Sequence, residues 1–182
     1  MRIVVSGTHA SGKSTLVSDL VMTLPGYASL GDPFDLVDVD DPACAASFLA
    51  QFEVSVERLA ELPRGACTVL ERGPLDFLAY LEALGALGRS TVAPAALDRL
   101  RATAAQALEG VDVLVVLALD EGHGIWVPEH EDPELREAMD RHLLDLCADD
   151  DLVAGVGQVI EVAGSPQDRA QVVLTAMGST AR

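Results

Sequence analysis

The sequence predicts a single α/β domain in which a five-stranded parallel sheet is covered by helices on both faces. The chain has 182 residues, which is enough for one domain with a sizeable core. Short apolar runs alternate with longer amphipathic segments along its whole length, without repeats or an interdomain linker. Continuously apolar strands that alternate with helices are typical of parallel sheets buried on both faces.

The first half of the chain begins this alternation. Residues 2–5 are a short apolar run typical of a buried strand, and residues 14–24 carry leucine and valine at helical spacing. A short strand is expected at 27–30, before a strongly acidic loop. Residues 43–62 have the pattern of a long helix, which a Pro-Arg-Gly turn ends. Residues 67–70 are again apolar and predict a buried strand.

The second half continues the same pattern. Pro74 stands where prolines begin helices, so a helix is expected from there to about Leu87. The most apolar run, residues 111–119, predicts another buried strand. Asp132-Pro133 combines an N-cap with a proline in the first turn, which predicts a helix start. The remaining elements are a helix at 94–108, a strand at 158–162 and a helix at 166–177.

A phosphate-binding motif lies between the first strand and the first helix. It reads Gly7-Thr8-His9-Ala10-Ser11-Gly12-Lys13-Ser14-Thr15 and matches the Walker A pattern G-x-x-x-x-G-K-[ST]. Glycines allow successive N–H groups to face a phosphate chain, and the following helix points its positive end toward it. Lys13 is the only lysine of the chain, and a compact ammonium suits this position better than a guanidinium. The motif predicts that residues 7–15, here called the phosphate loop, bind ATP, and that Ser14 binds Mg²⁺.

A second candidate site follows the strand at 67–70. Glu71 and Arg72 leave the carboxyl end of that strand, which is the edge where open α/β sheets bind ligands. Glu71 is expected to hold Mg²⁺, directly or through water, and Arg72 to bind a phosphate or an acceptor bidentately. Taken alone, the dipeptide would be an ordinary surface ion pair. Its place beside the phosphate loop favours the functional interpretation.

Composition and charge limit the partners. Twelve basic and 29 acidic residues give a formal net charge of −17, which would repel nucleic acid and anionic membranes, so neither is expected. No apolar run approaches the ~18 residues of a membrane span. The first strand begins at residue 2, so no signal peptide is expected and the protein is predicted to be cytoplasmic. Cys44, Cys67 and Cys147 lack metal spacing and are expected to be buried. A homodimer is left open.

These motifs resemble P-loop small-molecule kinases, the group of deoxyribonucleoside kinases, thymidylate kinases and ribosylnicotinamide kinase. Glu71-Arg72 resembles the acid-arginine pair that follows the third strand there, and residues 71–80 resemble bacterial putative kinases. Gly31-Asp32-Pro33-Phe34 resembles the Glu-Pro segment whose acid is the general base. Phe48-Leu49-Ala50-Gln51 resembles the helix whose glutamine reads a nucleobase. The resemblance implies a three-layer P-loop NTPase fold, a catalytic Asp32, and substrate contacts by Asp32, Gln51 and Arg72.

Two further segments resemble parts of the same kinases. Residues 126–137 resemble the lid of ribosylnicotinamide kinase-like proteins. This implies a lid at about 121–136 and adds Arg136 to Lys13 and Arg72 as a catalytic residue. Residues 164–166, with Arg169 behind them, resemble the adenine-side loop, which implies that Arg169 binds the nucleotide. Simpler alternatives are an Arg136–Asp140 pair on the helix surface and a solvated Gln51. Because Asp32 replaces the usual glutamate, the neighbouring acids Asp35, Asp38, Asp40 and Asp41 are alternative bases.

The predicted activity is an ATP-dependent kinase that phosphorylates a small molecule, with a nucleoside-like hydroxyl as the first choice. The catalysis would be mainly positioning and electrostatic stabilisation. The alternatives are a nucleoside-monophosphate kinase, an ATPase switch without an acceptor, and a nucleotide-binding protein without catalysis. The chain contains no asparagine and therefore lacks the Asn-Lys-x-Asp motif of a GTPase. His9 is expected to shape the phosphate loop or to line the acceptor pocket.

Overall fold

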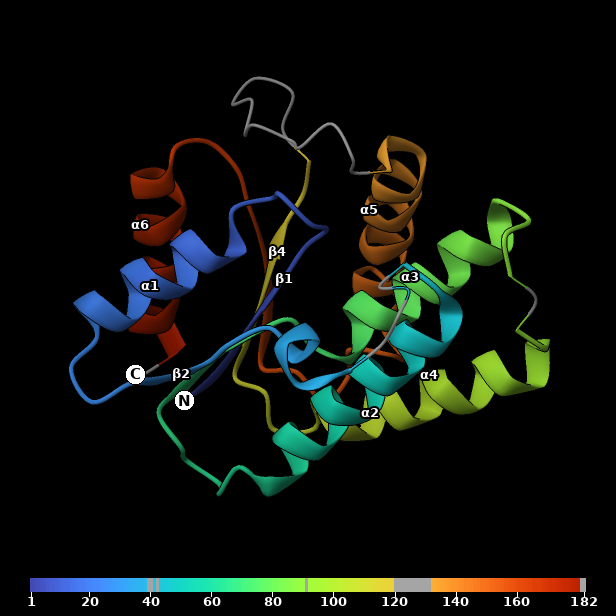
Figure 1. Cartoon of the computed structure of the whole chain (residues 1–182). Helices are drawn as coiled ribbons and strands as arrows, with labels where there is room; N and C mark the ends of the chain where they lie inside the picture. Colours follow the sequence, from blue (N-terminus) through green and yellow to red (C-terminus); the bar gives the residue numbers. More distant parts are fainter. Residues whose placement is uncertain (39–40, 42, 91, 120–131, 181–182) are drawn as a thin grey trace.

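The computed structural model describes residues 1–38, 41, 43–90, 92–119 and 132–180 and has a central parallel sheet (Figure 1). Its strand order is β2-β3-β1-β4-β5, which confirms the predicted five-stranded parallel sheet. The strands are β1 Arg2–Ser6, β2 Ala28–Leu30, β3 Thr68–Glu71, β4 Val113–Leu117 and β5 Gln158–Val162. Every predicted strand is therefore observed.

Each predicted helix is also present, with ends within a few residues of those expected. The helices are α1 Lys13–Thr23, α2 Ala45–Glu61, α3 Pro74–Ala86, α4 Pro94–Leu108, α5 Pro133–Cys147 and α6 Pro166–Thr180. A short 3₁₀ helix, η1 (Pro33–Leu36), was not predicted. Asp32 begins it because its Oδ1 accepts the Phe34 N–H at 3.0 Å, and Pro33 follows with a φ suited to a first turn.

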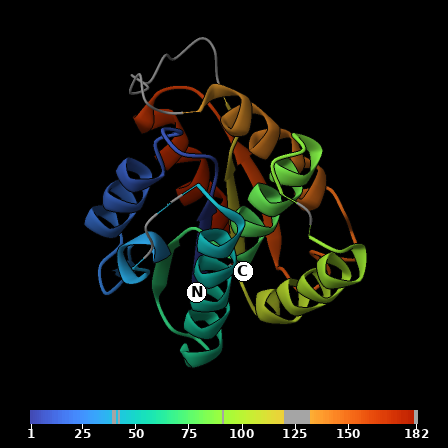
Figure 2. The same cartoon turned by 45° about the vertical axis from the view of Figure 1, so that its right-hand side comes forward.

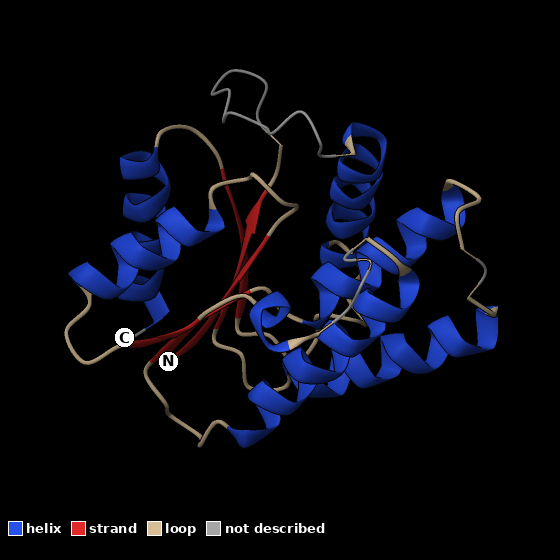
Figure 3. Cartoon of the chain, viewed as in Figure 1, coloured by secondary structure: helices blue, strands red, loops and turns tan. Residues whose placement is uncertain are grey.

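The sheet separates two hydrophobic cores. Helices α1 and α6 cover one face and helices α2 to α5 cover the other (Figures 1 and 3). Within β1, Ile3 and Val5 pack toward α1 and α6, whereas Val4 packs toward α2 and α3. Because both faces are covered, both sets of alternating residues are apolar. Figure 2 shows α2, α3 and α4 packed together on the second face.

The register of the sheet brings the candidate residues to one edge. Val5 of β1 lies opposite Glu71 of β3, and Leu30 of β2 lies opposite Leu70. The segments that follow β1, β2 and β3 therefore leave the sheet side by side. They carry the phosphate loop, Asp32 and Arg72, respectively.

The expected burial of the cysteines is wrong for one of them. Cys67 is exposed, because it lies just before β3 at the other edge of the sheet, and Cys44 and Cys147 are partly buried. Among the helices that the structure describes, none has the length and apolar character needed to span a membrane.

Candidate active site

The phosphate loop turns tightly between β1 and α1. Gly7 has φ +154°, and a Cβ there would lie 2.7 Å from Ser11 Oγ and 2.9 Å from the Leu117 carbonyl, so only glycine fits. The Lys13 side chain folds back over the loop, and its Nζ donates to the Thr8 carbonyl at 2.7 Å. Lys13 is only 4% exposed, and burial, together with the nearby Arg72 charge, lowers its pKa to about 7. An anionic ligand at the loop would favour the charged form.

The first turns of α3 support the loop from the side. Asp76 is completely buried, and its two carboxylate oxygens accept the N–H groups of Gly7 and Gly73, each at 2.9 Å. One turn further, the Tyr80 hydroxyl accepts the His9 N–H at 3.2 Å and lies 2.7 Å from His9 Nδ1. Asp76 and Tyr80 were not predicted as site residues. The available signal was their helical spacing on a helix that begins at the ligand-binding edge.

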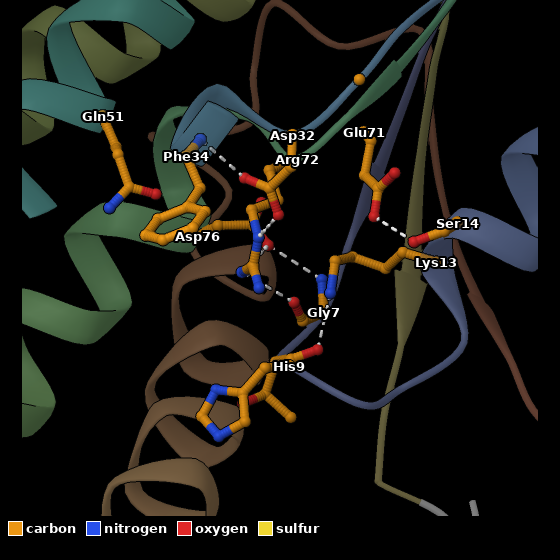
Figure 4. Close-up of polar contacts among 12 residues, drawn as sticks. Gly7, His9, Lys13, Ser14, Asp32, Phe34, Gln51, Glu71, Arg72 and Asp76 are labelled. Atoms are coloured by element: carbon orange, nitrogen blue, oxygen red, sulfur yellow. Dashed lines mark hydrogen bonds and ion pairs between the residues drawn. The ribbon is translucent and has the colours of Figure 1, made fainter. Parts of the chain in front are cut away.

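Arg72 connects the segments that follow β1, β2 and β3 at this edge of the sheet (Figure 4). Its Nε donates to Asp32 Oδ2 at 2.7 Å, its Nη1 donates to the Gly7 carbonyl at 3.2 Å, and the same nitrogen lies 3.7 Å from Asp76. Burial lowers the pKa of Arg72, but the Tyr80 hydroxyl and the two carboxylates outweigh it and raise the pKa above its ordinary value. Its φ of +65° is a left-handed conformation that costs roughly 1–3 kcal/mol in a non-glycine residue. These contacts hold the guanidinium in place despite that cost.

The two predicted magnesium ligands face each other. Ser14 Oγ donates a 2.7 Å hydrogen bond to Glu71 Oε1, with Ser14 in the first turn of α1 and Glu71 at the end of β3 (Figure 4). A hydroxyl and a carboxylate are hard oxygen donors of the kind that Mg²⁺ prefers when phosphates complete its coordination. The residues present therefore fit the ion. No group of three or more His, Cys, Asp or Glu side chains within the described ranges could hold a metal by itself.

An aromatic pocket of about 500 Å³ opens beside the phosphate loop. Its walls come from the loop, η1, the segment before α2, α2, α3 and the start of α5, and its lining residues are His9, Asp32, Phe34, Ala43, Phe48, Gln51, Arg72, Tyr80, Asp132 and Leu135. The rings of Phe48 and Tyr80 stack with centroids 4.3 Å apart. A larger cavity of about 1000 Å³ lies at the other edge of the sheet, beside Arg2 and Leu59, and contains none of the predicted site residues.

Gln51 lies in this pocket rather than on a solvated helix face. It is only 3% exposed, and its Nε2 donates to Ser47 Oγ at 2.9 Å one turn earlier in α2. The side chain points toward Phe34 and the pocket in Figure 4. The solvated alternative for Gln51 is therefore wrong. Of the alternative bases, Asp35, Asp38 and Asp41 are exposed outside the pocket, and Asp40 lies outside the described residues.

Two arginines that were predicted to contact substrates donate to the backbone of the phosphate loop. Arg136 of α5 donates to the carbonyls of His9 and Ala10, and Arg169 of α6 donates to the carbonyl of Ser11. The alternative Arg136–Asp140 pair does not form, and the Asp140 carboxylate accepts the Leu119 N–H at 3.1 Å. Most of the predicted lid, residues 121–131, lies outside the described residues.

His9 makes the stability of the nucleotide-free protein depend on pH. Burial, assisted by the charges of Arg72 and Lys13, lowers the pKa of His9 from 6.5 to about 4. Between these values the unfolded chain binds more protons, so stability is expected to fall as the pH falls from 6.5 toward 4. His9→Gln cannot titrate and should lose less stability between pH 7 and pH 5, measured as urea midpoints. Parallel losses in both proteins would contradict this expectation.

The strand order and the phosphate loop are those of a P-loop NTPase fold, and kinases are among the structural neighbours of the chain. The thymidylate kinase of Candida albicans superposes with a TM-score of 0.66 and 17% identity, over 98% of this chain and 91% of that chain. Deoxyadenosine kinase from M. mycoides with bound dATP gives a TM-score of 0.68 and 13% identity, over 98% and 100% of the two chains. The same enzyme with dCMP and dCDP bound gives a TM-score of 0.70 and 12% identity, over 98% of this chain and 100% of that chain.

No protein-family model matches the sequence, and no curated protein matches it. At identities of 12–17% the likeness establishes the fold alone. An activity therefore has to be inferred from the residues of this chain.

Proposed function

We propose that this protein is an ATP-dependent kinase that phosphorylates a hydroxyl group of an uncharged, ring-containing small molecule, first of all a nucleoside. The observation that carries the proposal is the aromatic pocket beside the phosphate loop, with Asp32 and Arg72 in its wall. In this arrangement an acceptor ring would lie against Phe34 and Phe48. Its hydroxyl would reach Asp32 at the side of the pocket nearest the loop.

The residues at the sheet edge would have different roles in the reaction. The amides of the phosphate loop and Lys13 would bind the phosphate chain of ATP. Ser14 and Glu71 would hold Mg²⁺, which when bound supplies positive charge to the phosphates. Asp32 would take the proton of the acceptor hydroxyl, and Arg72 would hold Asp32 in position through the 2.7 Å bond between them.

The charges of the pocket favour a hydroxyl acceptor over a phosphate acceptor. Arg72 is the only arginine or lysine among the described lining residues, and Asp32 and Asp76 already neutralise it. His9 is neutral at pH 7, because its pKa is lowered to about 4. Residues 102–135, which include the segment before α5, contain no lysine or arginine at all. Among the described lining residues a phosphate dianion would therefore meet no unpaired cation, because Arg72 is paired with Asp32 and Asp76. Asp132 is paired with Arg89, which lies outside the pocket lining.

The substrate class is tested by measuring ADP release from Mg-ATP under three conditions: with hydroxyl compounds, with nucleoside monophosphates, and with buffer alone. Nucleosides and related hydroxyl compounds are expected to stimulate ADP release, whereas nucleoside monophosphates and buffer alone are not. Stimulation by monophosphates only would make the protein a nucleoside-monophosphate kinase. Release that is independent of any acceptor would favour an ATPase switch. The net charge of −17 supports a small-molecule acceptor, because it would repel nucleic acid and anionic membranes.

Glu71→Gln is expected to raise the Mg²⁺ concentration needed for half-maximal activity roughly tenfold. The amide can still accept the hydrogen bond of Ser14, so the change removes the charge and little of the shape. Glu57→Gln is the matched control, because Glu57 is exposed on α2. An unchanged Mg²⁺ requirement in Glu71→Gln would make Ser14–Glu71 a structural hydrogen bond only.

A further inference from the structure

Three arginines from outside the phosphate loop donate to four of its backbone carbonyls. They come from the end of β3, from α5 and from α6, and the last two lie more than 120 residues from the loop in the sequence. The bonds are Arg72 Nη1 to Gly7 at 3.2 Å, Arg136 Nε to His9 at 3.1 Å, Arg136 Nη2 to Ala10 at 3.2 Å, and Arg169 Nη1 to Ser11 at 2.7 Å.

These bonds determine which way the loop amides point. In a trans peptide unit, the C=O of one residue and the N–H of the next point in opposite directions. Holding the carbonyls of His9, Ala10 and Ser11 toward the arginines therefore turns the N–H groups of Ala10, Ser11 and Gly12 away from them. Successive amides turned to one side form the concave nest that binds phosphate.

The geometry of Arg136 and Arg169 suits this backbone role. Arg136 spans two successive carbonyls with two different nitrogens, which a guanidinium can do and an ammonium cannot. Arg169 is only 5% exposed, so almost none of its surface remains for an adenine ring. Both side chains therefore donate to the backbone of the loop.

We infer that Arg136 and Arg169 are positioning residues that hold the phosphate loop in its binding shape from behind. The inference rests on the proposed nucleotide binding at that loop, but it changes the roles of the two arginines. A γ-phosphate contact by Arg136 would matter only for the triphosphate, and an adenine contact by Arg169 would matter only for the base. A loop-positioning role affects every ligand that carries a phosphate chain, whatever its base.

The decisive variant is Arg136→Lys, which keeps the positive charge and loses the double hydrogen bond. Binding of ADP, of a non-hydrolysable ATP analogue and of inorganic tripolyphosphate is expected to weaken by a similar factor, roughly tenfold. Weakened binding of the ATP analogue with unchanged binding of ADP would overturn the inference in favour of a direct γ-phosphate contact. Arg141→Lys is the matched control, because Arg141 is exposed on the same helix.

Arg169→Lys is expected to weaken tripolyphosphate and ADP binding alike. A loss confined to ADP would instead indicate a contact with the adenosine part and would overturn the role given to Arg169.

Amide hydrogen exchange of the nucleotide-free protein tests the same inference without any ligand. Exchange across residues 7–14 is expected to be faster in Arg136→Lys and Arg169→Lys than in wild type or Arg141→Lys, because the loop loses its carbonyl partners. Unchanged exchange in both variants would overturn the inference. If wild type binds no phosphate compound, the proposed function fails, and the exchange rates still report whether the arginines hold the loop.

Discussion

Lys13→Ala is expected to reduce phosphoryl transfer by roughly 10²–10³-fold, the loss typical of removing one electrostatic group from a preorganised site. Lys13 is the only lysine of the chain, and its Nζ lies over the loop, 2.7 Å from the Thr8 carbonyl. When phosphates occupy the loop, that ammonium is the charge available to leave Thr8 and bind them. Rates are measured by ADP release at saturating acceptor and varied ATP.

Lys13→Arg is expected to fail as well, although it keeps the charge. The site is almost completely buried, and a planar guanidinium is wider than an ammonium. Lys13→Ala should not melt at a much lower temperature at pH 7, because burial already disfavours the charged ammonium, as its lowered pKa shows. Turnover within about threefold of wild type in either variant would contradict the assignment of the phosphate loop.

Asp32→Asn is expected to lower turnover by roughly 10²–10⁴-fold, the usual contribution of a positioned general base. The amide oxygen can still accept the Phe34 N–H, so the first turn of η1 should keep its shape. The acceptor KM should change far less than turnover, because the aromatic wall of the pocket remains. The pH profile and the separate effects on kcat and KM are obtained from initial rates.

Asp35→Asn is the matched control for Asp32→Asn. Asp35 lies in the same 3₁₀ helix but is exposed, and it does not line the aromatic pocket. A large loss in Asp35→Asn with little change in Asp32→Asn would move the base to Asp35. A nearly silent Asp32→Asn with an intact control would indicate a phosphate acceptor, which needs no base.

The strands, the helices and the phosphate loop could be predicted because their signals are local. Short apolar runs mark β1, β3 and β4, and prolines at Pro74, Pro94 and Pro133 mark helix starts. The motif from Gly7 to Ser14 requires its residues at fixed spacing. The place of Glu71 opposite Ser14 also followed, since parallel strands present their carboxyl ends at one edge.

The 3₁₀ helix η1 was missed although its signal was present. Asp32-Pro33 has the same N-cap and proline as Asp132-Pro133, which did predict the start of α5. The turn is only four residues long and carries no helical repeat of apolar residues, so periodicity gave no indication of it. Its effect on the site is large, because it directs Phe34 toward the pocket and fixes the Asp32 carboxylate.

The sequence by itself determined the order of the elements, the class of the sheet and the identity of the phosphate loop. Only the tertiary structure decided which side chains meet around that loop. Asp76 binds the N–H of Gly7, and Arg136 and Arg169 bind carbonyls more than 120 residues away. An arginine on a helix carries no local mark of its partner, because the partner is chosen by how α5 and α6 pack against the sheet. Backbone carbonyls, which have no residue identity, cannot be recognised as partners in a sequence at all.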